Sequence, residues 1–497
     1  MNIKRLFSLL LALLMVTSAF LLAGCNKEPE TPVDTSDTGD VTDADTGIVF
    51  PSRNYGGEEF RILCTTQCHD LYKTDEEATT VIAQESLYRN LEVEDKYGVE
   101  LTFTPMEGRS AGSSAFVTAI RTASMTNDTS YDLVIGQTYY TMALALEGLY
   151  YNMATSEYLN LDQAWYDKEL VNDNIELGGK LYALSGSYVI SQVTTAMGLY
   201  YNKTIFEAKG FQNDLLGGNS IYNVVKEGNW TYELMYQMVT QVYSDEDNSS
   251  SANANDIYGF VGNLHAKMCA LIGSDTPFTT INEDGTLSVS GYYNDHLIKV
   301  FESYFTFFND TDSVYFVGSD EGLIEFFANG QALFCCNAIE YLAQSVVRDS
   351  GIDYGVLPFP KYTADQTDYY TNNIRWEVAH IPAACDTERA TIIFEYLNYL
   401  TYTDFIPVYF DEILALQVVP TQEDSDMLYM IRENILYDFT TFYQAQIGIS
   451  AGENIYTGVR NLLNTQTKDI ASWWSTNKDL YDQCLNDLVE TYLYFLE

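Results

Sequence analysis

The sequence is poor in positive charge and in histidine. Only 25 of its 497 residues are Lys or Arg, against 70 Asp and Glu, and only four are His. The formal net charge of −45 excludes a nucleic-acid partner, because such proteins gather Lys and Arg on a binding face. It also disfavours docking on anionic lipid, so any membrane contact has to come from another feature of the chain.

Catalytic motifs are lacking as well. The Gly-rich stretch at 217–220 has no Lys-Ser/Thr ending and is therefore no phosphate loop. Paired carboxylates for glycoside chemistry cannot be singled out, because 70 acids bring many chance pairs. The histidines lie far apart and form no metal-binding motif: His69, His265, His296 and His380. We therefore expect no enzymatic activity.

The cysteines do not form a recognisable disulfide framework. Seven of the eight follow Cys25, and an odd count in an exported protein leaves at least one unpaired. Most lie in apolar runs such as "ALFCCNAI", where Cys packs as a small hydrophobic residue. Cys64 and Cys68 could pair, but with His69 they make too small a set for a zinc site. We expect buried or free thiols.

The N-terminus has the pattern of an export signal. Lys4 and Arg5 precede an apolar run from Leu6 to Leu22, which ends in small residues. This run is at the short limit for spanning a bilayer, for which roughly 20 residues are needed. No second long apolar run is evident in the chain.

The residues Leu22-Ala23-Gly24-Cys25 resemble the lipobox of bacterial lipoproteins. That resemblance implies a diacylglycerol on the Cys25 sulfur and cleavage before it, which makes residues 1–24 the signal peptide. Two or three acyl chains on one residue are enough for stable anchoring. The expected location is the extracytoplasmic face of the cell membrane, with membrane contact through the lipid only.

The segment after Cys25 is an acidic tether. Residues 26–49 carry seven acids and a single base, Lys27, and little that could be buried. Such a composition predicts disorder, and a flexible chain of this length spans roughly 27 Å. We assign residues 25–54 to the lipidated cysteine and this tether.

The body of the chain alternates strands and helices. Apolar runs at 60–66, 99–104 and 131–136 predict strands, and helical patterns reach to about Lys96 and to near Gly148. Alternation of this kind predicts an α/β fold with parallel sheets crossed by helices.

Five motifs in order resemble the family 1 extracellular solute-binding proteins, relatives of maltose-binding protein that serve ABC importers. They lie between about residues 60 and 400: "YDLV" with "ALEGL", "GGKLYALSGSYVISQVTTAMGLYYNK", "NWTYELMYQM", "FFANGQALFCCNAIEYL" and "YGVLPFPKY". The chain departs from the family pattern in three ways. Ser185 stands where Pro is common, several extra residues precede Tyr200, and the chain beyond residue 417 matches only as generic helices.

The resemblance implies a type II fold of two discontinuous α/β lobes joined by a hinge. Lobe 1 is expected at 55–180 and 377–412, and lobe 2 at 181–376 and 413–497. Ligands of open α/β sheets lie beyond the carboxyl ends of the strands. A cleft between two such ends is expected to close around its ligand, because the ligand touches both lobes only in the closed state.

The resemblance also indicates which residues line that cleft. Sugars suit aromatic platforms combined with polar side chains, carboxylates accept from paired hydroxyls, and Arg offers a planar donor fork. The candidates are Gln137, Tyr139 and Tyr140 after strand 131–136, Tyr188 after the crossover, Asn337, Glu340 and Tyr341 after strand 332–336, and Arg375 and Trp376 before the strand "VAHIPA". Core packing, or for Glu340 a solvated helix start, is the alternative for each.

The acidic stretch 245–259 resembles the calcium loop of some relatives. Asp245, Asp247 and Asp256 have calcium-loop spacing, but Ser250 and Asp256 stand where Gly and Glu are usual. Calcium is possible there; we favour a flexible acidic loop, and expect no cofactor.

The function predicted from the sequence is a monomeric, lipid-anchored receptor that captures a small solute and presents it to an ABC permease. An oligosaccharide is the favoured ligand. Two alternatives stay open: a surface sensor or glycan-binding module of the same fold without transport, and a peptide or polyamine receptor, which the negative charge would suit.

Overall fold

The computed structural model describes most of the chain in two compact units, Met1–Ser52 and Arg53–Glu497, which are treated separately. The described residues are 41–42, 47–66, 69–73, 81–108, 113–126, 130–166, 168, 171, 179–249, 252–281, 286–289, 291–373, 377–409, 421–450, 453–465 and 467–494. Cys25 and Cys68 lie outside them.

The first unit contains a short antiparallel pair within the segment expected to be disordered. Strand β1 (Val41–Thr42) pairs with β2 (Val49–Phe50). The residues responsible are the few apolar ones in an acidic stretch, and valine and phenylalanine favour extended pairing. The expectation of a tether without any structure is corrected at these four positions.

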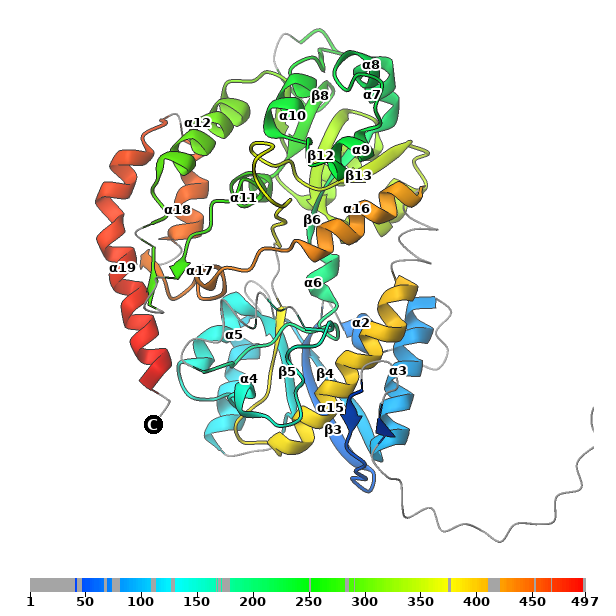
Figure 1. The fold of residues 1–497 in the computed structure, drawn as a ribbon, viewed down its shortest axis with the longest axis vertical. Helices are drawn as coiled ribbons and strands as arrows, with labels where there is room; N and C mark the ends of the chain where they lie inside the picture. Colours follow the sequence, from blue (N-terminus) through cyan, green and yellow to red (C-terminus); the bar gives the residue numbers. More distant parts are fainter. Residues whose placement is uncertain are drawn as a thin grey trace, which may run out of the picture. The chain divides into compact units, whose positions relative to one another are not determined.

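The second unit contains two larger sheets (Figure 1). The first has the order β14-β5-β3-β4, with β3 (Glu58–Thr65), β4 (Val99–Met106), β5 (Leu133–Gln137) and β14 (Glu377–His380). The second has the order β11-β8-β12-β6-β13, with β7 beside β8; its strands are β6 (Met197–Asn202), β7 (Tyr243–Ser244), β8 (Ile257–Gly262), β11 (Val314–Phe316), β12 (Ala332–Ala338) and β13 (Tyr354–Leu357).

The sheets are mixed, which corrects the expectation of parallel sheets. Strand β14 pairs antiparallel with β5, and β6 pairs antiparallel with both β12 and β13. Strands β6 and β14 each come directly after the chain has passed from one sheet to the other. A strand that enters its sheet from the hinge runs away from the hinge, whereas strands that arrive over a helix run toward it. The predicted α/β fold class is confirmed.

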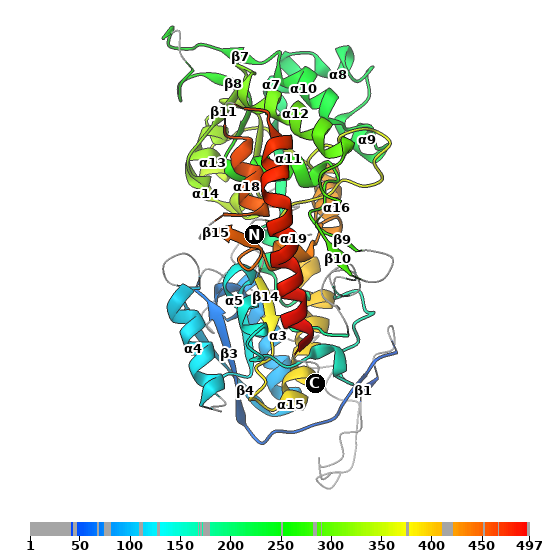
Figure 2. The ribbon, with the colours of Figure 1, turned by 90° about the vertical axis from the view of Figure 1, so that its left-hand side faces the viewer.

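Helices cover both sheets (Figures 1 and 2). Those assigned to lobe 1 are α2 (His69–Tyr72), α3 (Val81–Tyr97), α4 (Ser113–Met125), α5 (Thr138–Ala145) and α15 (Thr387–Leu400). A short helix, α6 (Ser191–Thr194), lies in the passage between the sheets. Those of lobe 2 are α7 (Lys203–Ala208), α8 (Phe211–Asp214), α9 (Ile221–Lys226), α10 (Tyr232–Val239), α11 (Leu264–Gly273), α12 (Asp295–Asn309), α13 (Asp320–Ala328), α14 (Ser345–Arg348), α16 (Gln422–Glu433), α17 (Phe439–Phe442), α18 (Ile455–Leu462) and α19 (Ile470–Tyr494).

Smaller elements complete the fold. They are the 3-10 helices η2 (Met153–Thr155) and η4 (Ile339–Ala343), the π-helical turn η5 (Thr401–Phe405), and the strand pairs β9 (Thr280–Ile281) with β10 (Leu287–Ser288) and β15 (Gly448–Ser450) with β16 (Glu453–Asn454). No helix in the described part of the chain is both long and apolar enough to cross a membrane.

The lobe ranges expected from the family resemblance can be compared with the sheets. Every strand of the four-stranded sheet lies within 55–180 or 377–412, and every strand of the six-stranded sheet lies within 181–376. The residue at which each lobe begins or ends stays a prediction. Cys64, Cys269, Cys335 and Cys336 are buried thiols outside any disulfide.

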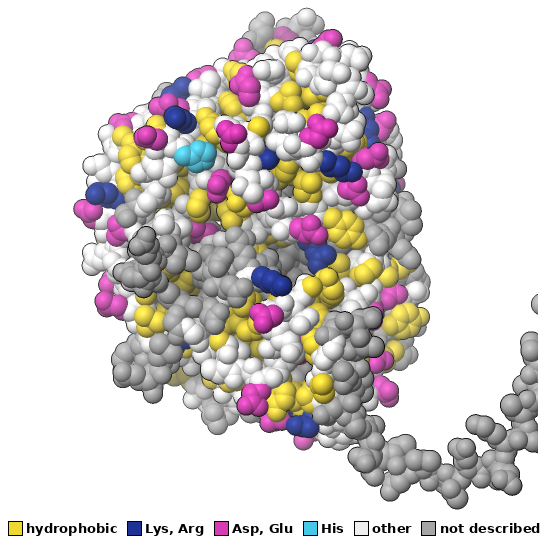
Figure 3. All heavy atoms as spheres, viewed as in Figure 1, with side chains coloured by type: hydrophobic (Ala, Val, Ile, Leu, Met, Phe, Trp, Pro, Cys, Tyr) yellow, Lys and Arg dark blue, Asp and Glu magenta, His cyan; other side chains and the backbone are white. Residues whose placement is uncertain are grey.

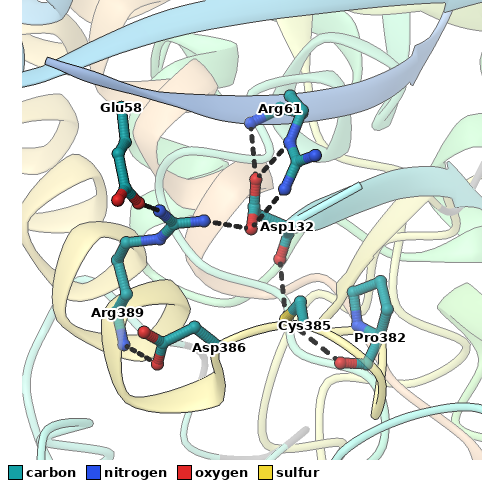
Figure 4. A network of polar contacts seen from close by, with 7 residues as sticks. All are labelled: Glu58, Arg61, Asp132, Pro382, Cys385, Asp386 and Arg389. Carbon is teal, nitrogen blue, oxygen red and sulfur yellow. Dashed lines mark hydrogen bonds and ion pairs between the residues drawn. The ribbon is translucent and has the colours of Figure 1, made fainter. Parts of the chain in front are cut away.

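Lobe 1 is held together by a buried carboxylate (Figure 4). Asp132 has no exposed surface, and its Oδ2 accepts hydrogen bonds from the backbone N of Arg61 at 2.9 Å and its Nε at 3.0 Å. Its Oδ1 accepts from Nη2 of Arg389 at 2.6 Å, and the same guanidinium donates to Glu58 at 2.6 Å. The carboxylate therefore joins β3, the start of β5 and the first turn of α15.

The C-terminal helix α19 (Figure 2) links lobe 2 to the residue that precedes the crossover. Along its length it packs against β10, β15 and α18. At its end the ammonium of Lys180, which is 1% exposed, donates to the carbonyls of Tyr492 at 3.2 Å and Leu493 at 3.4 Å. The Tyr492 hydroxyl donates back to the Lys180 carbonyl at 2.9 Å. Each of these two residues, 312 positions apart, therefore donates a hydrogen bond to the backbone carbonyl of the other.

Replacing the buried carboxylate should destabilise the protein strongly. Asp132→Asn leaves two guanidinium groups without their shared counter-charge, and we expect a loss of about 3–5 kcal/mol in the free energy of unfolding, measured by urea titration. Glu388→Gln is the matched control, because Glu388 is 54% exposed in its pair with Arg53 and should cost no more than about 1 kcal/mol. Equal losses in the two variants would contradict the assignment.

The stability of lobe 1 should fall in mild acid through His380. This residue has no exposed surface and stacks on Tyr150 at 4.1 Å; burial lowers its pKa to about 4. Because the unfolded chain binds the proton near pH 6.5, stability is lost as the pH falls from 6.5 to 4, by about 3 kcal/mol in all.

The measurement is a series of urea titrations across this pH range. His380→Gln should remove most of the decrease in the free energy of unfolding between pH 6.5 and 4. The smaller pH-dependence that other groups cause should persist. An unchanged slope in the variant would show that other groups cause the acid sensitivity.

Candidate functional site

The predicted residues of lobe 1 lie at the hinge side of its sheet. Gln137 is the last residue of β5 and pairs with Glu377, the first residue of β14. Tyr139 and Tyr140 occupy the first turn of α5, half-buried, with their rings edge to face at 4.9 Å. The carboxyl end of β5 therefore faces the passage between the lobes, as the fold predicts.

The predicted residues of lobe 2 lie at the corresponding end of its sheet. Asn337 is buried in β12, where its amide donates to the Asp320 carbonyl at 3.2 Å. Glu340 and Tyr341 follow in η4; Glu340 is half-buried and Tyr341 is 4% exposed. Burial raises the pKa of Tyr409, and the charge of Glu340 adds to this, so Glu340 lies close to the segment that follows η5.

Tyr188 is placed differently. Its ring has no exposed surface and packs within lobe 1, 5.3 Å from the ring of Tyr72, with the Arg89 guanidinium 4.8 Å from its centroid. This is the environment of a core residue, and its role as a ligand contact stays a prediction. Arg375 and Trp376 lie outside the described residues, so their roles stay predictions too.

A cavity of about 300 Å³ lies between residues of the two lobes. Its lining is Ala164, Trp165, Tyr166, Ser185, Gly186, Ser187, Val189, Gln192, Tyr402, Ile406, Arg432, Glu433, Ile435 and Tyr437. None of the predicted ligand contacts that the structure describes is among them. The cavity is thus a second candidate location for a ligand, next to the crossover and not at the ends of β5 and β12.

The lobe 1 wall of the cavity is fixed by a buried acid. Glu395, which is 2% exposed, accepts from the Tyr166 hydroxyl at 2.6 Å and from the Asn160 amide at 2.9 Å. Burial raises the pKa of this carboxyl, and these hydrogen bonds oppose the rise. The two bonds anchor the loop that carries Trp165, whose ring meets that of Tyr399 edge to face at 5.5 Å.

The other walls come from η5 with the residue after it, and from the end of α16 with the segment that follows. Tyr402 belongs to the π-helical turn that continues α15, and Ile406 directly follows this turn; such wider turns are frequent at functional sites. Arg432 and Tyr437 come from lobe 2, and burial lowers the pKa of the Arg432 guanidinium while neighbours such as Tyr402 and Glu433 oppose this. Aromatic faces, hydroxyls, an amide and one ion of each sign therefore surround the space.

This arrangement can bind but offers no evident chemistry. The cavity's polar groups suit a neutral ligand with many hydroxyls, since Gln, Ser and Tyr both donate and accept and the rings can cover apolar C–H surface. Its volume is at the lower end of the range for small-molecule sites. The lining contains no histidine or cysteine.

One departure from the family pattern points to this cavity. Ser185, which stands where the family commonly has Pro, lies in the cavity wall. Trp165, Tyr402 and Arg432 had no such signal, because they come from a loop, a helix end and the C-terminal part that matched no motif.

The acidic loop brings its three carboxylates together. Single oxygens of Asp245, Asp247 and Asp256 lie within 4.8 Å of one another. Hydrogen bonds from Asn255 and Ser249 lower the pKa of Asp247 to about 2, and Asp256 accepts from the backbone N of Glu246 at 3.2 Å and of Asn253 at 3.1 Å. These carboxylates are already compensated by the loop's own N–H donors, so calcium stays a possibility only.

Acidic side chains elsewhere are dispersed. On the face drawn in Figure 3 they are spread over the surface, with fewer Lys and Arg side chains between them. This face therefore shows no single charged patch that would mark a docking site.

The sequence matches a known family over part of its length. A family described as bacterial extracellular solute-binding protein matches residues 83–265. The resemblance predicted from the motifs is confirmed. The matched stretch runs from α3 through the crossover to the start of α11. The comparison with curated proteins gives no match.

Solved structures of such binding proteins share the fold. An ABC substrate-binding protein from Listeria monocytogenes in complex with cycloalternan has a TM-score of 0.51 at 11% identity, covering 88% of this chain and 99% of that one. A cyclo/maltodextrin-binding protein complexed with maltotetraose gives 0.51 at 13%, covering 89% and 98%. An ABC transporter solute-binding protein from Thermotoga lettingae bound with α-D-tagatose gives 0.51 at 13%, covering 86% and 100%. The two-lobed fold is thereby shown.

Calcium should leave the acidic loop unaffected. Because the Asp247 carboxylate already accepts hydrogen bonds from within the loop, we expect millimolar calcium to leave the melting temperature of the full chain unchanged. Asp247→Asn is the control. A rise with calcium in the wild type that is lost in this variant would contradict the expectation and establish a metal site.

Proposed function

We propose that this protein is a lipid-anchored receptor that binds an oligosaccharide between its lobes and delivers it to an ABC importer. The observation that carries the proposal is the cavity between the lobes, whose lining alternates aromatic rings with hydroxyl, amide and ionic groups. Such a lining suits a sugar, because a sugar presents apolar C–H faces and a ring of hydroxyls.

The comparisons support the same ligand class without naming a ligand. The matching family binds extracellular solutes, and the three structures described above are complexes with cycloalternan, maltotetraose and tagatose. At 11–13% identity these neighbours support the fold and make sugars the first compounds to test.

The importer and the anchor are further parts of the proposal. A solute-binding protein of this type needs a membrane permease as partner, and the lipobox at Leu22–Cys25 supports attachment through acyl chains at the extracytoplasmic face.

Mass spectrometry of the membrane fraction should find a diacylated N-terminal Cys25, and Cys25→Ser should move the protein to the soluble fraction.

The proposed function is tested by ligand-dependent stability. The full chain is melted with a panel of mono- and oligosaccharides and, for the alternative ligand class, polyamines and peptides. A ligand at 100 times its dissociation constant adds about 2.7 kcal/mol of stability, which a melting curve resolves. We expect a rise with one class of glycan.

Matched variants locate the ligand. Tyr402→Ala and Arg432→Met alter the cavity, whereas Trp376→Ala alters the site predicted from the family. Loss of the glycan effect in the first two, at least tenfold in Kd, would place the ligand in the cavity; loss only in Trp376→Ala would place it at the family site. A rise in melting temperature with polyamines alone, or no rise with any compound, would overturn the sugar proposal.

A further inference from the structure

Three segments of the second unit cross or line the passage between the lobes. The crossover 181–197 and the return segment 371–379 are joined by the bridges Leu184 to Ala379 and Ala196 to Asn373. The third segment, 434–437, follows α16 and pairs with Thr371 through Ile435. Any change in the separation of the lobes must rotate these segments against one another.

One side chain is bonded to all three segments. Gln192 lies in α6 and is 4% exposed. Its Nε2 donates to the Glu377 carbonyl at 2.6 Å, and its Oε1 accepts from the Tyr437 hydroxyl at 2.5 Å. The same Oε1 accepts from the Ser185 hydroxyl. An amide oxygen has two lone pairs, and both are used here.

The backbone of the same residue continues the junction. The Gln192 carbonyl accepts from the Asn373 amide at 2.6 Å, and Asn373 in turn accepts from the Thr195 hydroxyl at 2.7 Å. Gln192 is therefore the point at which the crossover, the return segment and the segment after α16 meet. Ser185, Gln192 and Tyr437 also line the cavity.

One departure from the family pattern takes part in this junction. The family resemblance makes proline common at the position of Ser185, and proline has no hydroxyl to donate to Gln192. The bond between Ser185 and Gln192 therefore depends on this departure.

We propose that Gln192 is a positioning residue that sets the separation of the two lobes and so the width of the cavity. This rests on the proposed function only in taking the cavity as a ligand site. A positioning residue of this kind acts by holding Tyr437 and Glu377 together across the hinge. When its side chain is removed, the lobes should rest farther apart and over a broader range of separations.

The test measures the distance between the lobes in the full chain without ligand. Spin labels are attached through a ketone-bearing amino acid at Met125 in lobe 1, which is 77% exposed, and at Leu264 in lobe 2, which is 45% exposed. Thiol labels are avoided because the chain has cysteines of its own. Double electron–electron resonance then gives the distribution of separations.

Four variants decide the outcome. Gln192→Ala should shift the distribution to longer and broader separations, and Tyr437→Phe, which removes one hydroxyl, should give part of that shift. Gln192→Glu keeps the two accepted hydrogen bonds but sets an oxygen against the Glu377 carbonyl in place of the donor, so it should also shift the distribution to longer separations. Tyr232→Phe is the matched control, because its hydroxyl bonds the Ser303 carbonyl inside lobe 2, and should leave the distribution unchanged.

The proposal is overturned if Gln192→Ala and Tyr437→Phe keep the wild-type distribution while circular dichroism shows that they are folded. Should Gln192→Ala fail to fold, Tyr437→Phe still decides. No ligand is used in this experiment, so a negative glycan panel would reject the proposed function without affecting the distance result. An unchanged distance distribution would reject the positioning role of Gln192 without affecting the proposed function.

Discussion

The direction in which strands enter the two sheets determines most of this structure. Because β6 and β14 come directly from the hinge, they run away from it, and β5 and β12 beside them run toward it. The carboxyl ends of β5 and β12 therefore meet the passage between the lobes. That single constraint places Gln137 and Glu340, far apart in the sequence, on facing ends of separate sheets, and leaves space between the lobes for a ligand.

Several strands were readable from the sequence because they are short runs rich in apolar and β-branched residues. The runs at 60–66 and 99–104 correspond to β3 and β4, and the family motif "YDLV" to the start of β5. Strand direction was not readable, since an apolar run has the same composition whichever way it pairs. Asp132, recognised only as a motif residue, proved to be the counter-ion of two arginines, a role that needs partners from distant segments.

The site was harder to predict than the fold for a physical reason. Residues after a strand can be assigned to a strand end, and Gln137 and Tyr140 lie where that rule puts them. The cavity instead depends on how a loop held by Glu395, a π-helical turn and a lobe 2 segment converge. No local pattern encodes such convergence. For Tyr188 the sequence does not distinguish a ligand contact from core packing; its ring packs beside Tyr72, and its ligand role stays a prediction.

The contacts between Lys180 and Tyr492 have a consequence for folding. A chain is made from its N-terminus, so lobe 1 lacks the strand β14 until residue 380 is present, and Lys180 lacks its partner until almost the last residue. Contacts so distant in sequence form slowly, because a long loop must close first. The C-terminal helix is therefore needed before this end of the crossover can reach its final packing.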